Sequence, residues 1–223
     1  MKKVLISVEG QTEETFVTEV LRPHFTGLGL FLTPILVKTR RLPGRPAHRG
    51  GYLTYPKVKR ELLSLLGDTS AVAVTTMYDF YKLPDSFPGH ASLPQGSGRQ
   101  RVQHLEVCLR EDIEDPRYRP YLQLHEFEAL LFVDIQKTTE WLLGDDQQLT
   151  QLHRIGQAFS NPEEIDEGEQ TAPSKRLKRI FPTYEKEADG PLIALDVGLS
   201  PLRDACPHFD EWITWLEQMA AET

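Results

Sequence analysis

Residues 2–14 read KKVLISVEGQTEE, and this stretch indicates how the chain folds. Its apolar run over residues 3–8 is rich in β-branched side chains and predicts a buried strand. Glu9 follows the run directly, and Glu13 and Glu14 come at a helix-like start. Glu9 is therefore expected at the carboxyl end of a first strand, where open α/β sheets bind their ligands.

The same alternation of strands and helices continues through the first half of the chain. Strands are predicted over residues 3–8, 31–37, 71–77 and 120–124, and helices over residues 12–26, 54–66 and 99–111. This pattern predicts an α/β fold, a mostly parallel sheet with helices on both faces. After residue 125 the spacing becomes mostly helical, over residues 137–143, 147–159 and 209–219, the last with an apolar stripe.

We therefore expect an α/β core over residues 1–134 and a mainly helical C-terminal extension over residues 135–223 that packs on the core. The chain has 223 residues, of which 39% are hydrophobic, and this is enough for one sizeable core. Cys108 and Cys206 lie far apart without other cysteines or histidines in a zinc-site spacing, so no disulfide framework or structural metal is indicated. No apolar stretch approaches membrane-spanning length, and a cytoplasmic protein is expected.

Charge is unevenly distributed in this acidic chain. The net charge of -8 argues against indiscriminate binding of nucleic acid. One segment nevertheless has no acid and many basic residues: Lys38, Arg40, Arg41, Arg45, Arg49, Lys57, Lys59 and Arg60. This segment is a candidate polyanion site. A second basic group, either a further contact or a solvated surface, comprises Lys175, Arg176, Lys178, Arg179 and Lys186.

Three predicted strands end in acidic residues. Glu9 follows the first strand, Asp79 follows the third, and Glu126 and Glu128 come after the fourth. In a parallel sheet these ends lie at one edge, so the carboxylates are expected to meet. Hard oxygen ligands suit Mg²⁺ or Mn²⁺, ions that serve phosphoryl chemistry. Glu13 lies one helical turn beyond Glu9 and is expected to point to the same edge.

Each of these residues also has a purely structural interpretation. Glu14 suits the positive end of the helix dipole whatever the function, and Asp79 suits a turn. Glu126 and Glu128 face one side only if their segment is extended, so we expect one of them in the site. His125 is either a ligand or base, or a residue with satisfied hydrogen bonds.

Several motifs resemble known families. The stretch VEGQTEE at residues 8–14 resembles the opening motif of Toprim domains, especially those of the overcoming-lysogenization-defect (OLD) nucleases. TTMYDFYKLP at residues 75–84, PYLQLHEFEALLF at residues 120–132 and APSKRL at residues 172–177 resemble a bacterial family of Toprim-like proteins, the domain of unknown function DUF4276. This second resemblance covers nearly the whole chain.

The resemblance implies roles for particular residues. In Toprim enzymes the first glutamate has acid/base or metal-binding duty and a pair of aspartates holds Mg²⁺, roles that fall here on Glu9 and Asp79. Tyr81 stands in the place of the second aspartate, so the carboxylate of Glu13, Glu126 or Glu128 is needed to complete the site. Members of the family are often encoded beside ATPases, which implies an ATPase partner and a role in phage defence or genome maintenance.

The leading hypothesis is a nuclease that depends on Mg²⁺ or Mn²⁺ and acts on DNA or RNA. Besides the basic segment above, Lys82, Lys175 and Arg176 are candidate phosphate contacts. One alternative is a catalytically silent Toprim-like subunit that binds an ATPase or nucleic acid. Another is a small-molecule phosphohydrolase or phosphotransferase with the Gly- and Pro-rich loop over residues 87–98 as a lid.

Overall fold

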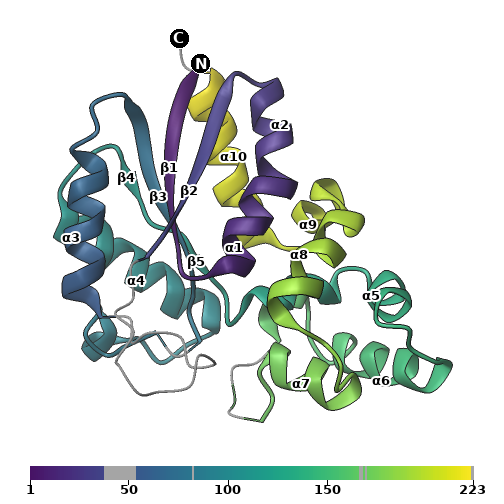
Figure 1. Ribbon diagram of the computed structural model, residues 1–223. Coiled ribbons are helices and arrows are strands. Elements are labelled where there is room, and N and C mark those ends of the chain that lie inside the picture. The colour runs from purple at the N-terminus through teal and green to yellow at the C-terminus, as the bar shows by residue number, and fades with distance from the viewer. Residues whose placement is uncertain (38–53, 82, 166–167, 169, 222–223) are drawn as a thin grey trace, which may run out of the picture.

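The structure, a computed structural model, describes residues 1–37, 54–81, 83–165, 168 and 170–221. Figure 1 shows a central sheet with helices packed against both of its faces. The two termini lie at the same end of the sheet, where Lys2 Nζ donates to the carbonyl oxygen of Met219 at 2.8 Å. The predicted α/β fold class is confirmed.

The sheet has five strands in the order β2-β1-β3-β4, with β5 also beside β3. They are β1 (Lys2–Val8), β2 (Leu30–Leu36), β3 (Ala71–Asp79), β4 (Tyr118–Arg119) and β5 (Leu122–Gln123). Every strand pair within the described residues is parallel. Val8 at the end of β1 lies beside Leu36 of β2 and Met77 of β3. The carboxyl ends of the three long strands therefore lie at one edge.

The predicted strand over residues 120–124 is wrong in its extent, because the chain forms two short strands there. Pro120 lies between β4 and β5 and has no N–H for the ladder. The Thr76 side chain bridges the break: its Oγ1 accepts from Tyr121 N–H at 3.0 Å and donates to the Tyr121 carbonyl at 2.9 Å. A side chain thus replaces the missing backbone pairing.

The helix predicted over residues 12–26 forms, but with a wider turn inside it. It consists of α1 (Gln11–Phe16), a π-helical turn (Val17–Leu21) and α2 (Arg22–Gly27). The wider turn ends at Leu21, two residues before Pro23, whose ring nitrogen cannot donate to the preceding turn.

Two buried apolar clusters lie on opposite faces of the sheet. Val4 and Ile6 of β1 point into one cluster and Leu5 into the other, as the alternation of a strand requires. The first cluster is covered by α1, α2 and the C-terminal helix α10 (Pro207–Ala221), and the second by α3 (Tyr55–Leu66) and α4 (Gly98–Ile113). Burial of each such Val, Leu or Ile stabilises the fold by roughly 1.5–3 kcal/mol.

The second part of the chain is mostly helical, as expected. It contains α5 (Ile135–Trp141), α6 (Asp146–Gly156), α7 (Pro173–Ile180), α8 (Lys186–Val197), α9 (Leu199–Ala205) and α10, with short 3₁₀ turns at η3 (Phe127–Phe132) and η4 (Pro162–Glu164). The apolar stripe of α10 lies in the core: Trp212 is 2% exposed and its Nε1 donates to Thr75 Oγ1 of β3 at 3.1 Å. A further 3₁₀ turn, η2 (His90–Ser92), lies in the loop over residues 87–98. No helix in the described part of the chain is long and apolar enough to cross a membrane.

Candidate active site

Asp79 is the last residue of β3, and its backbone and side chain are both held in place. Beyond it, Phe80 N–H and Tyr81 N–H continue the pairing to the carbonyls of Gln123 and His125, at 3.0 and 2.7 Å. The Asp79 Oδ1 atom accepts from Phe127 N–H at 2.8 Å. The second oxygen, Oδ2, points to the ammonium group of Lys186 at 3.0 Å.

Lys186, the first residue of α8, lies between three carboxylates. Its Nζ is 3.0 Å from Asp79 Oδ2, 3.1 Å from Glu128 Oε2 and 4.0 Å from Glu13 Oε1. The three acids come from β3, η3 and α1, so the carboxyl edge of the sheet and the C-terminal helices build this site together. We call Glu9, Glu13, Asp79, Glu128 and Lys186 the edge cluster.

Glu13 and Glu9 lie on the α1 side of the edge cluster. Glu13 is 4% exposed, and its Oε2 accepts from Gly10 N–H at 2.9 Å, which fixes the side chain at the start of α1. Glu9 directly follows β1 and its side chain is exposed to solvent. Glu9 is close enough to Asp79 and Lys186 for their charges to act on it. The structure places Glu9, Glu13 and Asp79 at the same edge of the sheet.

The edge cluster has more negative charge than one lysine balances. Burial, with the charges of Asp79 and Glu9, raises the pKa of Glu13 to about 8 although Lys186 opposes the shift. Burial also raises the pKa of Glu128 to about 7. The pKa of Glu9 is raised as well, because the surrounding protein removes water from its carboxyl group and because the negative charge of Asp79 is nearby. Burial disfavours the charged form of Lys186, but Asp79, Glu128 and Glu13 outweigh it and raise the pKa of Lys186.

Glu126 and Glu128 have different surroundings. Both oxygens of Glu126 accept hydrogen bonds from Ser174, from its N–H at 2.8 Å and its hydroxyl at 3.0 Å, so Glu126 caps the start of α7. Glu128 is fully buried, with Oε2 facing Lys186 and Oε1 accepting from the Tyr184 hydroxyl at 3.5 Å. Of the two acids, Glu128 is therefore the one directed at the edge cluster.

His125 and Tyr81 lie beside the edge cluster. His125 has a left-handed backbone with φ of 60° and is 4% exposed. The His125 ring packs closely against Gly98, the first residue of α4. A Cβ atom at Gly98 would lie only 2.9 Å from the ring. Tyr81 is half-buried, and its N–H reaches the His125 carbonyl as described above. The backbone of both residues helps to shape the strand ends.

The candidate phosphate-binding residues divide into two groups. Arg40, Arg41, Arg45, Arg49 and Lys82 lie outside the described residues. Lys175 is exposed in the first turn of α7. Arg176 is half-buried, with its Nε donating to the Thr171 carbonyl and its guanidinium 5.6 Å from the Phe159 ring centre. Of these two, only Lys175 is freely accessible to a ligand.

Lys186 is the residue of this site that the sequence pattern did not single out. It belonged only to a basic group that was equally compatible with a solvated surface. Lys186 is 107 residues away from Asp79 in the sequence, so no local spacing of residues could indicate that the two side chains meet. A lysine at the start of a helix, where the dipole disfavours a cation, was the one available signal.

The edge cluster supplies oxygen donors of the kind that Mg²⁺ prefers. In the described part of the chain, however, no three Asp, Glu, His or Cys side chains are arranged to hold a metal ion. The carboxylates surround the Lys186 ammonium group instead. The donor type therefore suits a divalent cation, whereas the arrangement of the carboxylates around Lys186 is that of an ion-pair cluster.

Comparison with known proteins gives a family and two similar structures. A search of curated proteins found no significant match. The chain is similar to the C-terminal region of the Xanthomonas campestris pv. campestris OLD protein, with 19% identity, 99% of this chain and 97% of that one covered, and a TM-score of 0.41. It is also similar to the C-terminal region of the Burkholderia pseudomallei OLD protein, with 14% identity, 99% of each chain covered and a TM-score of 0.45. At these values neither likeness assigns a role to any residue.

The family assignment comes from the sequence profile, which matches most of the chain. The profile described as "Domain of unknown function (DUF4276)" matches residues 8–217, from the last residue of β1 to within α10. The family suggested by the motifs at residues 75–84, 120–132 and 172–177 is thereby confirmed, and this chain belongs to the DUF4276 family.

Proposed function

We propose that this protein is a phosphodiesterase that cleaves nucleic acid with the help of Mg²⁺ or Mn²⁺, and that the edge cluster is its active site. The observation that carries the proposal is the excess of carboxylates, four of them near one ammonium group at the carboxyl edge of a parallel sheet. Such an excess is costly in a partly buried site unless a cation or protons neutralise it. A divalent cation is the neutralising group that also serves phosphodiester chemistry.

The residues of the edge cluster have distinct parts in this proposal. Glu9, Asp79 and Glu128 would hold the cation, which would supply Lewis-acid assistance to phosphodiester hydrolysis. Asp79 is pre-oriented by the Phe127 N–H and Glu128 by its full burial, so neither has to be ordered when substrate arrives.

Lys186 and Glu13 complete the proposed mechanism. The Lys186 side chain is 35% exposed, so in this proposal its ammonium group donates to a non-bridging phosphate oxygen while it remains near Asp79 and Glu128. Glu13 is the carboxyl group placed to exchange a proton with the reacting oxygen atoms, since its Oε1 faces Lys186 while its Oε2 is held by Gly10. The basic segment over residues 38–60 is the proposed guide for the nucleic-acid backbone. An ATPase partner and a role in phage defence belong to this proposal through the family resemblance alone.

A cleavage assay with matched variants tests the proposal. Wild-type protein is incubated with supercoiled plasmid, single-stranded DNA and RNA, in Mg²⁺, Mn²⁺ or EDTA. We expect metal-dependent cleavage that falls roughly a hundredfold or more in Asp79→Asn, Lys186→Met and Glu13→Gln. Glu14→Gln is the control for Glu13→Gln, because the half-buried neighbour undergoes the same chemical change on the same helix. Cleavage that persists in EDTA, or that Asp79→Asn leaves intact, contradicts the proposal.

A catalytically silent subunit is the second candidate. The observation that favours it is that Lys186 already pairs with two carboxylates, and that no ligating trio of side chains exists in the parts of the chain that are described. In that case Asp79→Asn leaves the binding of an ATPase or of nucleic acid unchanged. Retained binding together with absent cleavage, in the presence of the candidate partner, distinguishes this alternative from the nuclease.

A further inference from the structure

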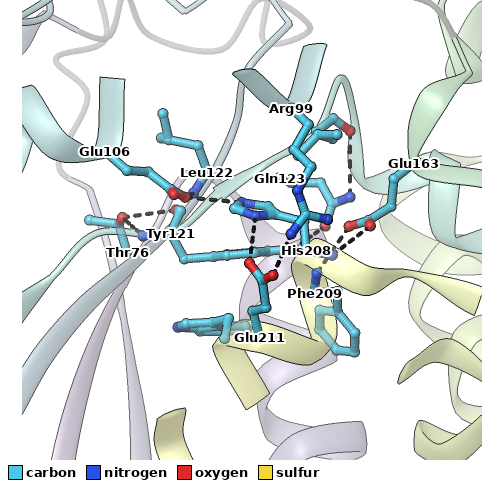
Figure 2. A network of polar contacts seen from close by, with 12 residues as sticks. Thr76, Arg99, Glu106, Tyr121, Leu122, Gln123, Glu163, His208, Phe209 and Glu211 are labelled. Carbon is cyan, nitrogen blue, oxygen red and sulfur yellow. Dashed lines mark hydrogen bonds and ion pairs between the residues drawn. The ribbon is translucent and has the colours of Figure 1, made fainter. Parts of the chain in front are cut away.

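A second pocket lies between α4, the β4–β5 segment and α10, and no edge-cluster residue lines it. Its volume is about 390 Å³, within the range of small-molecule sites. α4 contributes Gln103, Glu106 and Arg110, whose spacing of three and four residues places them on one helix face. We call this cavity the α4–α10 pocket. Figure 2 shows the polar network that forms part of its wall.

The acidic side chains of the α4–α10 pocket already have cationic partners. Glu106 Oε1 accepts from Leu122 N–H at 2.9 Å and lies 3.1 Å from His208 Nε2 (Figure 2). Glu211 forms an ion pair with Arg99, and its Oε2 is 3.9 Å from His208 Nδ1. These contacts fix both carboxylates at the wall and largely offset their charge.

Two arginines of the α4–α10 pocket have no such partner. Within the described part of the chain, neither Arg110 nor Arg119 forms an ion pair with a carboxylate. Arg110 is exposed at the end of α4, and Arg119 is half-buried with its guanidinium 5.3 Å from the Trp215 ring centre. Burial lowers the pKa of Arg119, and the charge of Arg110 adds to this effect, whereas the charges of Glu106 and Glu211 oppose it. Both guanidinium groups line the pocket and remain available for hydrogen bonds to an anion.

His208, the partner of Glu106, also lines this pocket. Its side chain is 5% exposed, and the Nδ1 atom has no hydrogen-bond partner among the described residues. The hydrogen bond to Glu106 raises the pKa of His208 although burial opposes the rise. With Glu106 and Glu211 already engaged, the charge that remains in the pocket is positive.

We propose that the α4–α10 pocket binds the phosphate monoester of a small organic phosphate, held between Arg110 and Arg119. Guanidinium groups are suited to this because they donate two parallel hydrogen bonds to phosphate oxygens. Gln103, Glu106 and Glu211 provide amide and carboxylate groups for the hydroxyl or amino groups of the remainder of the ligand. Such a monoester occurs both in free nucleotides and at the phosphorylated end of a nucleic-acid strand. The site is independent of the proposed nuclease activity.

Tryptophan fluorescence gives a direct test, because Trp212 lines the pocket and the Trp215 ring contacts the guanidinium group of Arg119. The full chain in EDTA is titrated with AMP, adenosine, inorganic phosphate, and a trinucleotide with or without a 5′-phosphate. We expect AMP to change the emission with a Kd that rises about tenfold in Arg110→Gln. Adenosine is expected to bind at least about tenfold more weakly than AMP. Arg154→Gln is the control, since this arginine is exposed on α6 and does not line the pocket.

The other ligands and variants distinguish a free nucleotide from a phosphorylated strand end, and they show whether a loss of binding results from misfolding. One outcome is that the 5′-phosphorylated trinucleotide binds, AMP does not, and Arg110→Gln weakens the binding of the trinucleotide. This outcome assigns the site to a strand end and still supports the phosphate-monoester proposal. Arg110→Gln is the primary variant because Arg110 is exposed, whereas Arg119→Gln also removes the contact with Trp215 and needs a near-UV circular dichroism check. Asp79→Asn is expected to bind AMP normally even if cleavage is lost. No binding of any phosphate-bearing probe, or binding that Arg110→Gln leaves unchanged, overturns the proposal.

Discussion

At the residue scale, Lys186 is the one positive charge in the edge cluster, and its loss exposes the repulsion among the carboxylates. In EDTA, Lys186→Met is expected to lower the free energy of unfolding by roughly 2–3 kcal/mol at about pH 8.5, when the neighbouring carboxylates are charged. At about pH 5.5 the loss should be smaller, because carboxyl groups with raised pKa are then protonated and need no counter-charge. Urea denaturation at both pH values measures this. The control is Lys175→Met, at an exposed lysine of α7, and an equal loss at both pH values contradicts the account.

His208 provides a second prediction at this scale. Its pKa is raised because its hydrogen bond to Glu106 and the Glu106 charge outweigh burial. The stability that this pair contributes is therefore fully present below the unfolded-state pKa of about 6.5 and is lost as the pH rises through the folded-state pKa. Glu106→Gln is expected to lower the pKa of His208 in an NMR titration of the imidazole resonances. Glu111→Gln, on an exposed position of α4, should leave it unchanged, and an unshifted His208 in Glu106→Gln would show that the pair does not set this pKa.

At the element scale, the start of α10 is capped by a side chain from a distant segment. Glu163 of η4 is 1% exposed, and its oxygens accept from His208 N–H at 2.8 Å and Phe209 N–H at 3.1 Å. Glu163→Ala leaves both donors unsatisfied and is expected to cost about 1–3 kcal/mol in the free energy of unfolding. Glu163→Gln, which keeps an acceptor, should cost less, and Glu164→Ala should be nearly neutral. Thermal unfolding of the three variants compares them, and similar melting temperatures for Glu163→Ala and Glu164→Ala argue against the cap.

Local sequence predicted most elements but not the interruptions within them. The apolar run before Glu9 and the alternation that follows it were sufficient for the parallel sheet and its flanking helices, because burial dominates both patterns. Pro120 divides a predicted strand into two, and Pro23 follows a π turn inside a predicted helix. Each irregularity occurs where a proline lacks the backbone N–H that the regular pattern requires. Glu9, Glu13 and Asp79 could be placed at one edge from the position of strand ends alone. Lys186 and the choice of Glu128 over Glu126 depend on tertiary packing of α8, η3 and α7, which local spacing does not encode.

At the scale of the whole molecule, the edge cluster makes stability depend on pH. Glu13 and Glu128 hold protons in the folded state to about pH 8 and about pH 7, but only to about 4.5 when unfolded. The folded state therefore binds more protons than the unfolded state in this interval, and these groups make the free energy of unfolding decrease as the pH rises. In EDTA, Glu13→Gln is expected to flatten this decrease between about pH 5 and about pH 8.5, whereas Glu14→Gln should not. Chemical denaturation across the interval measures the slope, and identical slopes for Glu13→Gln and the wild type would contradict the assignment.

The most direct test of the central claim is calorimetric titration of Mg²⁺ and Mn²⁺ into the wild type and into Glu9→Gln/Asp79→Asn protein. A metal-binding edge cluster predicts that the wild type binds metal and releases protons as it does so, because its carboxyl groups are partly protonated beforehand. It also predicts loss of that binding in the double variant and its retention in Glu14→Gln. Absence of metal binding in the wild type, or binding that the double variant keeps, would contradict a metal-dependent active site at this edge of the sheet.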